Sequence, residues 1–334
     1  MTTTAIYTHA DCFLHNPGEG HPESPTRLKD ILAALETEFP KNGTVQWKEA
    51  PMGTDAQVLY CHTPEHLARI KQIVAGQTAT SAPANTDVDT RVSEGSLKAA
   101  LRGVGAGCQA VDDVYAGKVN RAFCAVRPPG HHALKNTSMG FCLFGNVAIA
   151  GFHALTKPGI ERVAIIDFDV HHGNGTQELV EHNPKILFFS THQKPLWPYQ
   201  PESESTVRGA VGNIRNFPVP EKCDTQVHYD IFTKQIVPEL LAFKPDFVIL
   251  SAGFDAHRDD PPAESNLFND PPGRQMLVEK DFDWMTAQLL DVAEKTAKGR
   301  FVSMLEGGYN TKVLASSCLS HMRTLSGNRK AAAA

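Results

Sequence analysis

The segment from Asp167 to Asn174 holds the side chains best suited to chemistry in this chain of 334 residues. Asp167, Asp169 and His171 stand at alternate positions directly after the apolar run Arg162–Ile166, which predicts a buried strand. Because alternate side chains of a strand share a face, two carboxylates and an imidazole should converge at its carboxyl end, where open α/β sheets bind ligands. Asp169 and His171 suit a divalent metal ion as ligands, whereas Asp167 and Asn174 suit hydrogen bonds that orient histidines.

Two further predicted strands end in similar side chains. The strand Arg121–Val126 leads into His131 and His132, which stand in a loop bounded by Gly and Pro. Imidazoles titrate near neutrality, so this pair could supply a general base and a general acid, with surface or core histidines as the alternative. The strand Asp246–Asp255 ends in a carboxylate that would complete a set of two aspartates and one histidine. Three protein ligands and an open position are typical of a catalytic metal site, although Asp255 taken alone would more often cap a helix.

A fourth predicted strand, Arg300–Glu306, is followed by Gly307, Gly308 and Tyr309. Paired glycines permit a turn that other residues resist, and this turn would direct the Tyr309 hydroxyl towards a developing oxyanion. A simple turn is the alternative interpretation. Together the four segments offer a metal that acidifies water, a base, an acid and an oxyanion donor, which are the requirements of metal-assisted amide hydrolysis.

The composition is ordinary for a globular chain, with 41% hydrophobic and 21% charged residues. A formal net charge of −5 and the lack of Lys/Arg runs argue against nucleic acid as a direct partner. No apolar stretch reaches the ~18 residues of a spanning helix, and the N-terminus lacks a signal-peptide pattern, so we expect no membrane contact. The seven cysteines are scattered without a C-x-x-C pair, which predicts reduced, mostly buried thiols and a cytoplasmic location.

Strand-like and helix-like runs alternate along the chain. Lys185–His192 reads as a further strand. Apolar residues at helical spacing predict helices at Ser24–Phe39, Glu94–Ala116, Thr225–Phe243 and Glu279–Lys298. This alternation predicts an α/β fold: a single domain with a central, mostly parallel sheet and helices on both faces. We expect the domain to span residues 1–328, with residues 329–334 as a disordered tail or an expression remnant.

Two long irregular stretches, Pro195–Pro220 and Arg258–Gln275, follow predicted strand ends and should border the site. Gly103, Gly105 and Gly107 fall inside a predicted helix and match no nucleotide-binding loop. Close packing of that helix against a neighbour is therefore the expected role of these three glycines.

Four motifs together resemble the zinc-dependent histone deacetylase family. The motifs are Arg-Pro-Pro-Gly-His-His-Ala from Arg127, Asp-Phe-Asp-Val-His-His-Gly-Asn-Gly-Thr-Gln from Asp167, Ser-Ala-Gly-Phe-Asp-Ala from Ser251 and Leu-Glu-Gly-Gly-Tyr-Asn from Leu305. The likeness starts at the His-Pro-Glu-Ser-Pro-Thr-Arg segment from His21 and covers nearly the whole chain. Asn174 and Glu306 make the chain more similar to the class II and bacterial branch, which includes histone deacetylase-like amidohydrolases. The resemblance implies a single-domain arginase/deacetylase-type fold.

The resemblance also implies catalytic roles. His132 would act as general base and acid, and Asn174 would orient it. His131, backed by Asp167, would be its electrostatic partner, and Tyr309 would polarise the acyl carbonyl. The expected reaction is hydrolysis of an N-acyl amide such as acetyl-lysine. The alternatives are an acetylpolyamine amidohydrolase, a weakly catalytic acyl-lysine binding module and a manganese ureohydrolase of the same fold, while homo-oligomerisation is left open.

Ion binding is a further implication of the resemblance. Zinc, or ferrous iron in the cell, would be held by Asp169, His171 and Asp255. A structural potassium ion beside it would be held by Asp167, Asp169, His171, Ser190 and Thr191.

The substrate tunnel is the part in which this chain departs from the family pattern. The residues implied near it are Gly140, Phe141, Gly307, Gly308 and, beside an inner acetate cavity, Arg27. The aromatic residue of the opposite wall is either Trp197 or Tyr199, and the sequence does not choose between them. Pro262 stands where one polyamine-selective branch has an acidic residue, with Glu264 two positions later, which favours acyl-lysine over a polyamine substrate.

Overall fold

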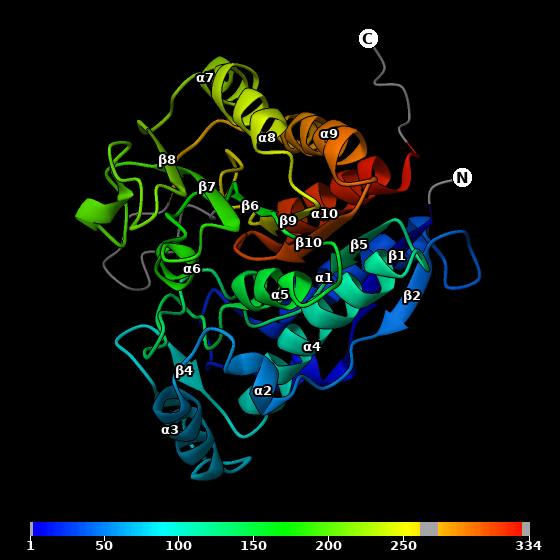
Figure 1. Ribbon diagram of the computed structural model, residues 1–334. Helices are drawn as coiled ribbons and strands as arrows, with labels where there is room; N and C mark the ends of the chain where they lie inside the picture. The colour runs from blue at the N-terminus through cyan, green and yellow to red at the C-terminus, as the bar shows by residue number, and fades with distance from the viewer. Residues whose placement is uncertain (1–2, 261–272, 329–334) are drawn as a thin grey trace.

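The computed structural model describes residues 3–260 and 273–328. Its centre is an eight-stranded sheet with the strand order β2-β1-β5-β10-β9-β6-β7-β8 (Figure 1). All neighbouring strands in this sheet pair in parallel. The strands are β1 (Thr4–Thr8), β2 (Gln46–Glu49), β5 (Arg121–Cys124), β6 (Val163–Asp167), β7 (Ile186–Gln193), β8 (Ile214–Val219), β9 (Phe247–Ala252) and β10 (Phe301–Leu305).

Helices cover both faces of the sheet. On one side lie α4 (Ser96–Tyr115) and α5 (Asn146–Leu155), and on the other α9 (Glu279–Thr296) and α10 (Thr311–Ser326) (Figure 1). Helix α1 (Pro25–Glu38) packs against α10. This arrangement confirms the predicted α/β fold with helices on both faces of a parallel sheet.

Shorter elements complete the described chain. They are η1 (Ala10–Leu14), α2 (Asp55–Val58), α3 (Pro64–Ala75), the antiparallel pair β3 (Ala84–Asn85) and β4 (Arg91–Val92), α6 (Asn174–Val180), η2 (Pro201–Ser203), α7 (Thr225–Ile231), the π-helical turn η3 (Phe232–Ile236) and α8 (Val237–Phe243). The expected tail 329–334 lies outside the described residues.

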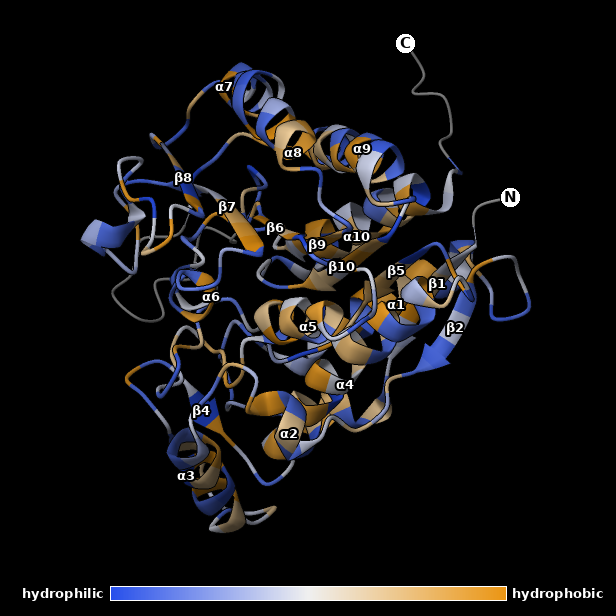
Figure 2. Cartoon of the chain, in the orientation of Figure 1, coloured by the Kyte–Doolittle hydropathy of each residue, from blue (hydrophilic) through white to orange (hydrophobic). Residues whose placement is uncertain are grey.

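The burial of the inner strands accounts for the apolar runs from which these strands were predicted. All residues of β5, β6, β7, β9 and β10 are buried, because helices cover the sheet on both sides. A strand buried on both faces contains a largely apolar run, as in residues 163–166 of β6 and 186–189 of β7. Figure 2 shows this apolar centre, with hydrophilic residues on the outer turns of α7 and α9.

Some local predictions were wrong. The stretch Pro195–Pro220, expected to be irregular throughout, contains η2 and the edge strand β8, which pairs with β7 from Phe188↔Ile214 onwards. The helix predicted over Thr225–Phe243 is divided by the π-helical turn into α7 and α8. Pro238, near the start of α8, has no N–H for the regular hydrogen-bond ladder, which accounts for a break at this point.

The glycines of α4 confirm the packing interpretation. A Cβ atom on Gly105 would lie 2.0 Å from the carbonyl oxygen of Pro51, and one on Gly103 would lie 3.1 Å from the Asn146 side chain. The helix therefore approaches its neighbours more closely than larger residues would allow.

All seven cysteines are buried and free of disulfide bonds. Within residues 3–260 and 273–328, no helix combines the length and apolar content needed to cross a lipid bilayer.

Parallel strands place their carboxyl ends at one edge of the sheet. The segments that follow β5, β6, β9 and β10 therefore meet there, and they contain His131, Asp169, Asp255 and Tyr309. These are the segments in which the sequence places its reactive side chains.

Candidate active site

Asp169, His171 and Asp255 converge at this edge as a group that could hold a metal ion. Each offers one ligand atom, and these atoms all lie within 4.8 Å of one another. His171 Nδ1 lies 3.0 Å from Asp169 Oδ1 and 3.2 Å from Asp255 Oδ2. The two aspartates are buried at 0% and 2% exposure, so a cation there would offset the cost of their burial. Two carboxylate oxygens and one imidazole nitrogen suit a catalytic divalent ion.

Backbone groups and glycines shape this cradle. The N–H of Gly307 donates to Asp169 Oδ2 at 2.9 Å, and the N–H of Val170 donates to Asp255 Oδ1 at 2.8 Å. A Cβ on Gly307 would lie 2.2 Å from Asp255 Oδ2, and one on Gly253 would lie 1.9 Å from Asp169 Oδ2. Only glycine at these two positions leaves room for the carboxylates, so the site is built for two acidic groups at close range. The donor set and its surroundings fit a divalent metal ion.

His131 lies beside this cradle and is held by Asp167. Its Nδ1 is 2.9 Å from Asp167 Oδ2, and both residues are buried. Burial opposes protonation of His131, but the charges of Asp169 and Asp167 outweigh it and raise the pKa of His131 to about 10. The His131 imidazole is therefore cationic at neutral pH.

The pKa of His132 is shifted in the opposite direction. Burial, reinforced by the positive charges of His131 and His171, lowers the pKa of His132 well below its ordinary value. Its Nδ1 lies 2.6 Å from Asn174 Oδ1. An amide oxygen only accepts, so Nδ1 carries the proton and Nε2 keeps a free lone pair. Two histidines whose ring centroids are 3.9 Å apart thus differ in charge, as an acid/base pair requires.

Tyr309 lies between Arg27 and Phe141. The Arg27 guanidinium carbon is 4.9 Å from the centre of the Tyr309 ring, and the Phe141 ring meets it edge-on at 5.9 Å. Burial, together with the negative charges of Asp255 and Asp169, raises the pKa of Tyr309 well above its ordinary value despite the opposing charge of Arg27. The phenol therefore keeps its proton and can donate a hydrogen bond.

Trp197 is the aromatic residue that contacts the histidines. Its ring lies 4.6 Å from that of His132 and 6.2 Å from that of His171, whereas Tyr199 is 58% exposed. A Cβ on Gly140 would lie 2.7 Å from Trp197 and 2.4 Å from His132, so this position requires glycine.

Phe141 has a left-handed backbone with φ 67°, which is costly for a bulky residue. Its N–H donates to Thr90 Oγ1 at 3.0 Å, and the preceding N–H of Gly140 donates to Asp89 Oδ1 at 2.9 Å. These two bonds hold the strained turn, and the sequence alone had not singled out Asp89 or Thr90.

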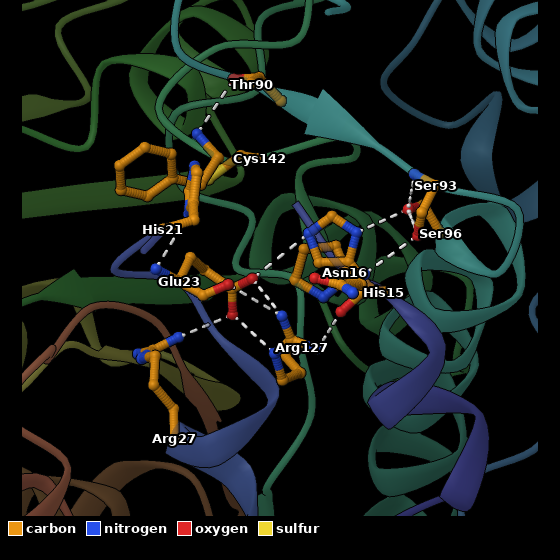
Figure 3. A network of polar contacts seen from close by, with 12 residues as sticks. His15, Asn16, His21, Glu23, Arg27, Thr90, Ser93, Ser96, Arg127 and Cys142 are labelled. Atoms are coloured by element: carbon orange, nitrogen blue, oxygen red, sulfur yellow. Dashed lines mark hydrogen bonds and ion pairs between the residues drawn. The ribbon is translucent and has the colours of Figure 1, made fainter. Parts of the chain in front are cut away.

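A buried charge network behind the site was also missed. Arg127 donates to both carboxylate oxygens of Glu23, at 2.8 and 2.5 Å, and Arg27 donates to Glu23 Oε1 at 3.0 Å (Figure 3). All three side chains are fully buried. Arg27 continues to the carbonyl oxygens of Glu306 and Gly308, each at 2.5 Å. The i,i+4 spacing of Glu23 and Arg27 was a usable signal, but the link to Arg127 was not visible in the sequence.

Two more buried carboxylates hold the site's turns. Glu306 Oε2 accepts from the N–H of Gly130 at 2.7 Å and from that of His131 at 3.1 Å. Asp260 Oδ2 accepts from the N–H of Tyr309 at 2.6 Å and from that of Asn310 at 2.7 Å. The sequence had suggested Glu306 only as a branch marker and had given Asp260 no role.

Ser190 and Thr191, in the second half of β7, lie next to the candidate metal strand, and Ser190 pairs with Asp167. Ser190 Oγ is 2.9 Å from His192 Nδ1, and Thr191 Oγ1 donates to the carbonyl oxygen of Asp167 at 3.4 Å. Their predicted role in potassium binding stays a prediction. Pro262 and Glu264, the residues considered for substrate choice, lie outside the described residues.

Comparisons with known proteins agree with this geometry. A sequence profile described as "Histone deacetylase domain" matches residues 21–325. The chain is 38% identical to an uncharacterized protein of Synechocystis, over 96% of this chain and 99% of that one. It is 32% identical to a histone deacetylase-like amidohydrolase of Pseudomonas aeruginosa, over 93% of this chain and 78% of the relative. The crystal structure of the HDA15 HD domain is similar with a TM-score of 0.87 and 31% identity, covering 100% of this chain and 92% of that one.

Proposed function

Because the chain belongs to the histone deacetylase family, we propose that this hydrolase removes acyl groups from acetyl-lysine or a similar acylated amine. Zinc is the proposed ion, with ferrous iron as its alternative, and a structural potassium ion is proposed beside Ser190 and Thr191. The observation that carries the proposal is the pair of adjacent histidines, His131 held by Asp167 and His132 held by Asn174, beside the Asp169, His171 and Asp255 cradle. A protein that only binds acyl groups has no need of such a pair.

The metal ligands, the two histidines and Tyr309 divide the catalytic work in this proposal. A divalent ion held by Asp169, His171 and Asp255 would supply Lewis acidity to a water molecule and to the acyl carbonyl. His132 Nε2 takes the proton from the attacking water and then gives it to the leaving amine. His131 stays cationic against Asp167 and stabilises the negative charge that develops on the acyl carbon's oxygens.

Tyr309 completes the polar set. Its protonated hydroxyl donates to the oxyanion that forms when water adds to the carbonyl, and the free energy of that bond is gained only as charge develops. Gly140, Phe141 and Trp197 are proposed to flank the acyl-bearing chain, because apolar walls exclude bulk water and strengthen the electrostatic contacts inside. Trp197 is preferred over Tyr199 since it packs on the histidines.

A turnover panel tests the proposal. The metal-replete protein is assayed with acetyl-lysine peptides, longer acyl-lysine peptides and acetylated polyamines at matched concentration. We expect the acyl-lysine peptides to give the highest kcat/KM. A clear preference for polyamines would replace the substrate class, and no hydrolysis of any of the three would refute the proposed activity.

A further inference from the structure

The turn from Glu306 to Asn310 is held by backbone bonds to the segment after β9 and by side chains from elsewhere in the fold. Arg27 binds the carbonyl oxygens of Glu306 and Gly308, and Asp169 binds the N–H of Gly307. Gly308 has a φ of 118°, so the chain turns there in a conformation that cannot continue the backbone hydrogen bonds of a strand or helix. The position of Tyr309 therefore depends on what holds the backbone that follows Gly308.

Asp260 is the side chain that holds that backbone. A single oxygen, Oδ2, accepts from the N–H of Tyr309 at 2.6 Å and from the N–H of Asn310 at 2.7 Å. The residue is 3% exposed, and its other oxygen is buried without a hydrogen-bond partner among the described residues. Both distances lie at the short end of the range for N–H···O hydrogen bonds. A buried carboxylate with one oxygen shared by two donors is an anchor for this turn.

Asp260 is itself held rigidly with respect to the candidate metal ligand Asp255. Between them the N–H of His257 donates to the Phe254 carbonyl at 3.1 Å, and the N–H of Asp260 donates to the His257 carbonyl at 2.9 Å. The N–H of Phe254 donates to the Gly307 carbonyl at 3.0 Å. Asp260 and Asp255 thus belong to one short, internally bonded segment, which is fastened to the turn that contains Tyr309.

We propose that Asp260 is a positioning residue that sets the place of the Tyr309 hydroxyl relative to the metal cradle. This inference rests on the proposed function, in which that hydroxyl donates to the developing oxyanion. Without Asp260, two N–H groups lose their acceptor and the backbone of Tyr309 can shift. A displacement of about 1 Å in such a group can cost roughly a hundredfold in rate. The side chain touches no reacting atom, and its two bonds are to the backbone of Tyr309 and Asn310, so we expect its effect to pass through Tyr309.

The chain offers a matched control in the adjacent residue. Asp259 has a side chain that is 59% exposed, with weak ion pairs to His257 and Arg258 at 3.9 and 3.8 Å. Its contact with Asn310 is made by the backbone carbonyl, which substitution leaves in place. Asp259→Ala therefore removes a carboxylate from the same loop without removing the anchor.

A double-mutant cycle tests the proposal in the metal-loaded protein. We expect Asp260→Ala to lower kcat roughly tenfold to a hundredfold with KM within about twofold, and Asp260→Asn, which keeps an acceptor oxygen, to retain most of kcat. In a Tyr309→Phe background the Asp260→Ala change should cost nothing further, whereas an equal additional loss would overturn the proposal. If Asp260→Ala lacks a cooperative unfolding transition, Asp260→Ser, whose side chain is one bond shorter, replaces it in the cycle.

A second measurement does not depend on turnover. Fluorotyrosine is incorporated at the six tyrosines, and the Tyr309 resonance is identified by its loss in Tyr309→Phe. Asp260→Ala should shift or broaden that resonance, and Asp259→Ala should leave it unchanged. An unchanged resonance in Asp260→Ala would overturn the positioning role, whether or not the wild-type protein is active. Failure of the wild-type protein to hydrolyse any of the acyl amides would count against the proposed function and not against the positioning role.

Discussion

His132 and Asn174 are joined by a 2.6 Å contact between Nδ1 and Oδ1, which fixes the tautomer of the imidazole. The Asn174 amide nitrogen lies 3.3 Å from Met139 Sδ, a weak acceptor, so the amide oxygen is the atom directed at the ring. An uncharged acceptor favours the protonated form of the ring less than a carboxylate would. Asn174 thus orients the His132 ring while the pKa of His132 stays low.

Asn174→Asp should therefore change the pH dependence of turnover. The new carboxylate favours imidazolium, so the pKa of His132 should rise. His132 must be neutral to act as a base, and the acidic limb of the kcat/KM profile should move to higher pH by the same amount. The exposed Asn42→Asp variant adds the same charge far from the site and should leave the profile unchanged. A limb that stays in place or moves to lower pH would contradict the assignment of His132 as base.

Glu23 should be essential to stability. Burial would raise the pKa of Glu23, but the charges of Arg127, His15 and Arg27 outweigh it and hold the pKa well below its ordinary value. Glu23→Gln leaves two fully buried guanidinium groups without a carboxylate, and we expect a loss of about 3–5 kcal/mol in the free energy of unfolding. Urea unfolding measures this loss, and the exposed Glu19→Gln provides the control. A loss below about 1 kcal/mol would show that the two arginines find other acceptors.

The sequence was sufficient where structure follows from local pattern. The inner strands are apolar because both faces are covered, and Asp169 and Asp255 follow β6 and β9 at fixed offsets that parallel strands bring together. The fold and the candidate metal residues could therefore be predicted. Edge strand β8 could not, because its buried positions alternate with partly buried ones, include the polar Asn216, and are interrupted by Pro218.

Contacts between segments far apart in the sequence could not be predicted from local sequence patterns. Glu23 and Arg127 are 104 positions apart, and Asp260 and Tyr309 are 49 apart. In the sequence, Asp260 looked like part of a proline-rich loop because nothing in its neighbours reveals a backbone N–H that needs an acceptor. The choice between Trp197 and Tyr199 likewise depends on how the loop after β7 folds back over the histidines.

Metal binding should stabilise the wild-type protein and not a ligand variant. Asp169 and Asp255 bring buried negative charge into one cradle, so a bound cation adds free energy of about 2.7 kcal/mol at an ion concentration of roughly 100 times its Kd. Zinc added to chelator-treated protein should raise Tm, while Asp255→Asn should show a much smaller rise and retain less metal by elemental analysis. Asp259→Asn should behave as wild type. Equal responses of Asp255→Asn and wild type would exclude Asp255 as a ligand.

His321 should make the fold sensitive to mild acid. It lies fully buried between β10 and α9, with Nε2 2.8 Å from Ser303 Oγ and Nδ1 2.9 Å from Thr286 Oγ1. Both partners are uncharged hydroxyls, and burial lowers the pKa of His321 from its ordinary value of 6.5 to about 3.

The sign of the effect follows from which state binds the proton. Below pH 6.5 the unfolded chain protonates His321 and the folded protein does not. The contribution of neutral His321 to the free energy of unfolding is therefore complete above pH 6.5 and is lost as the pH falls towards about 3. Between pH 6.5 and 5 the free energy of unfolding should fall by about 2 kcal/mol through this residue. His321→Asn should flatten that part of the pH profile of urea unfolding, whereas the exposed His182→Asn should not. A profile as steep in His321→Asn as in wild type would mean that other buried groups cause the acid sensitivity.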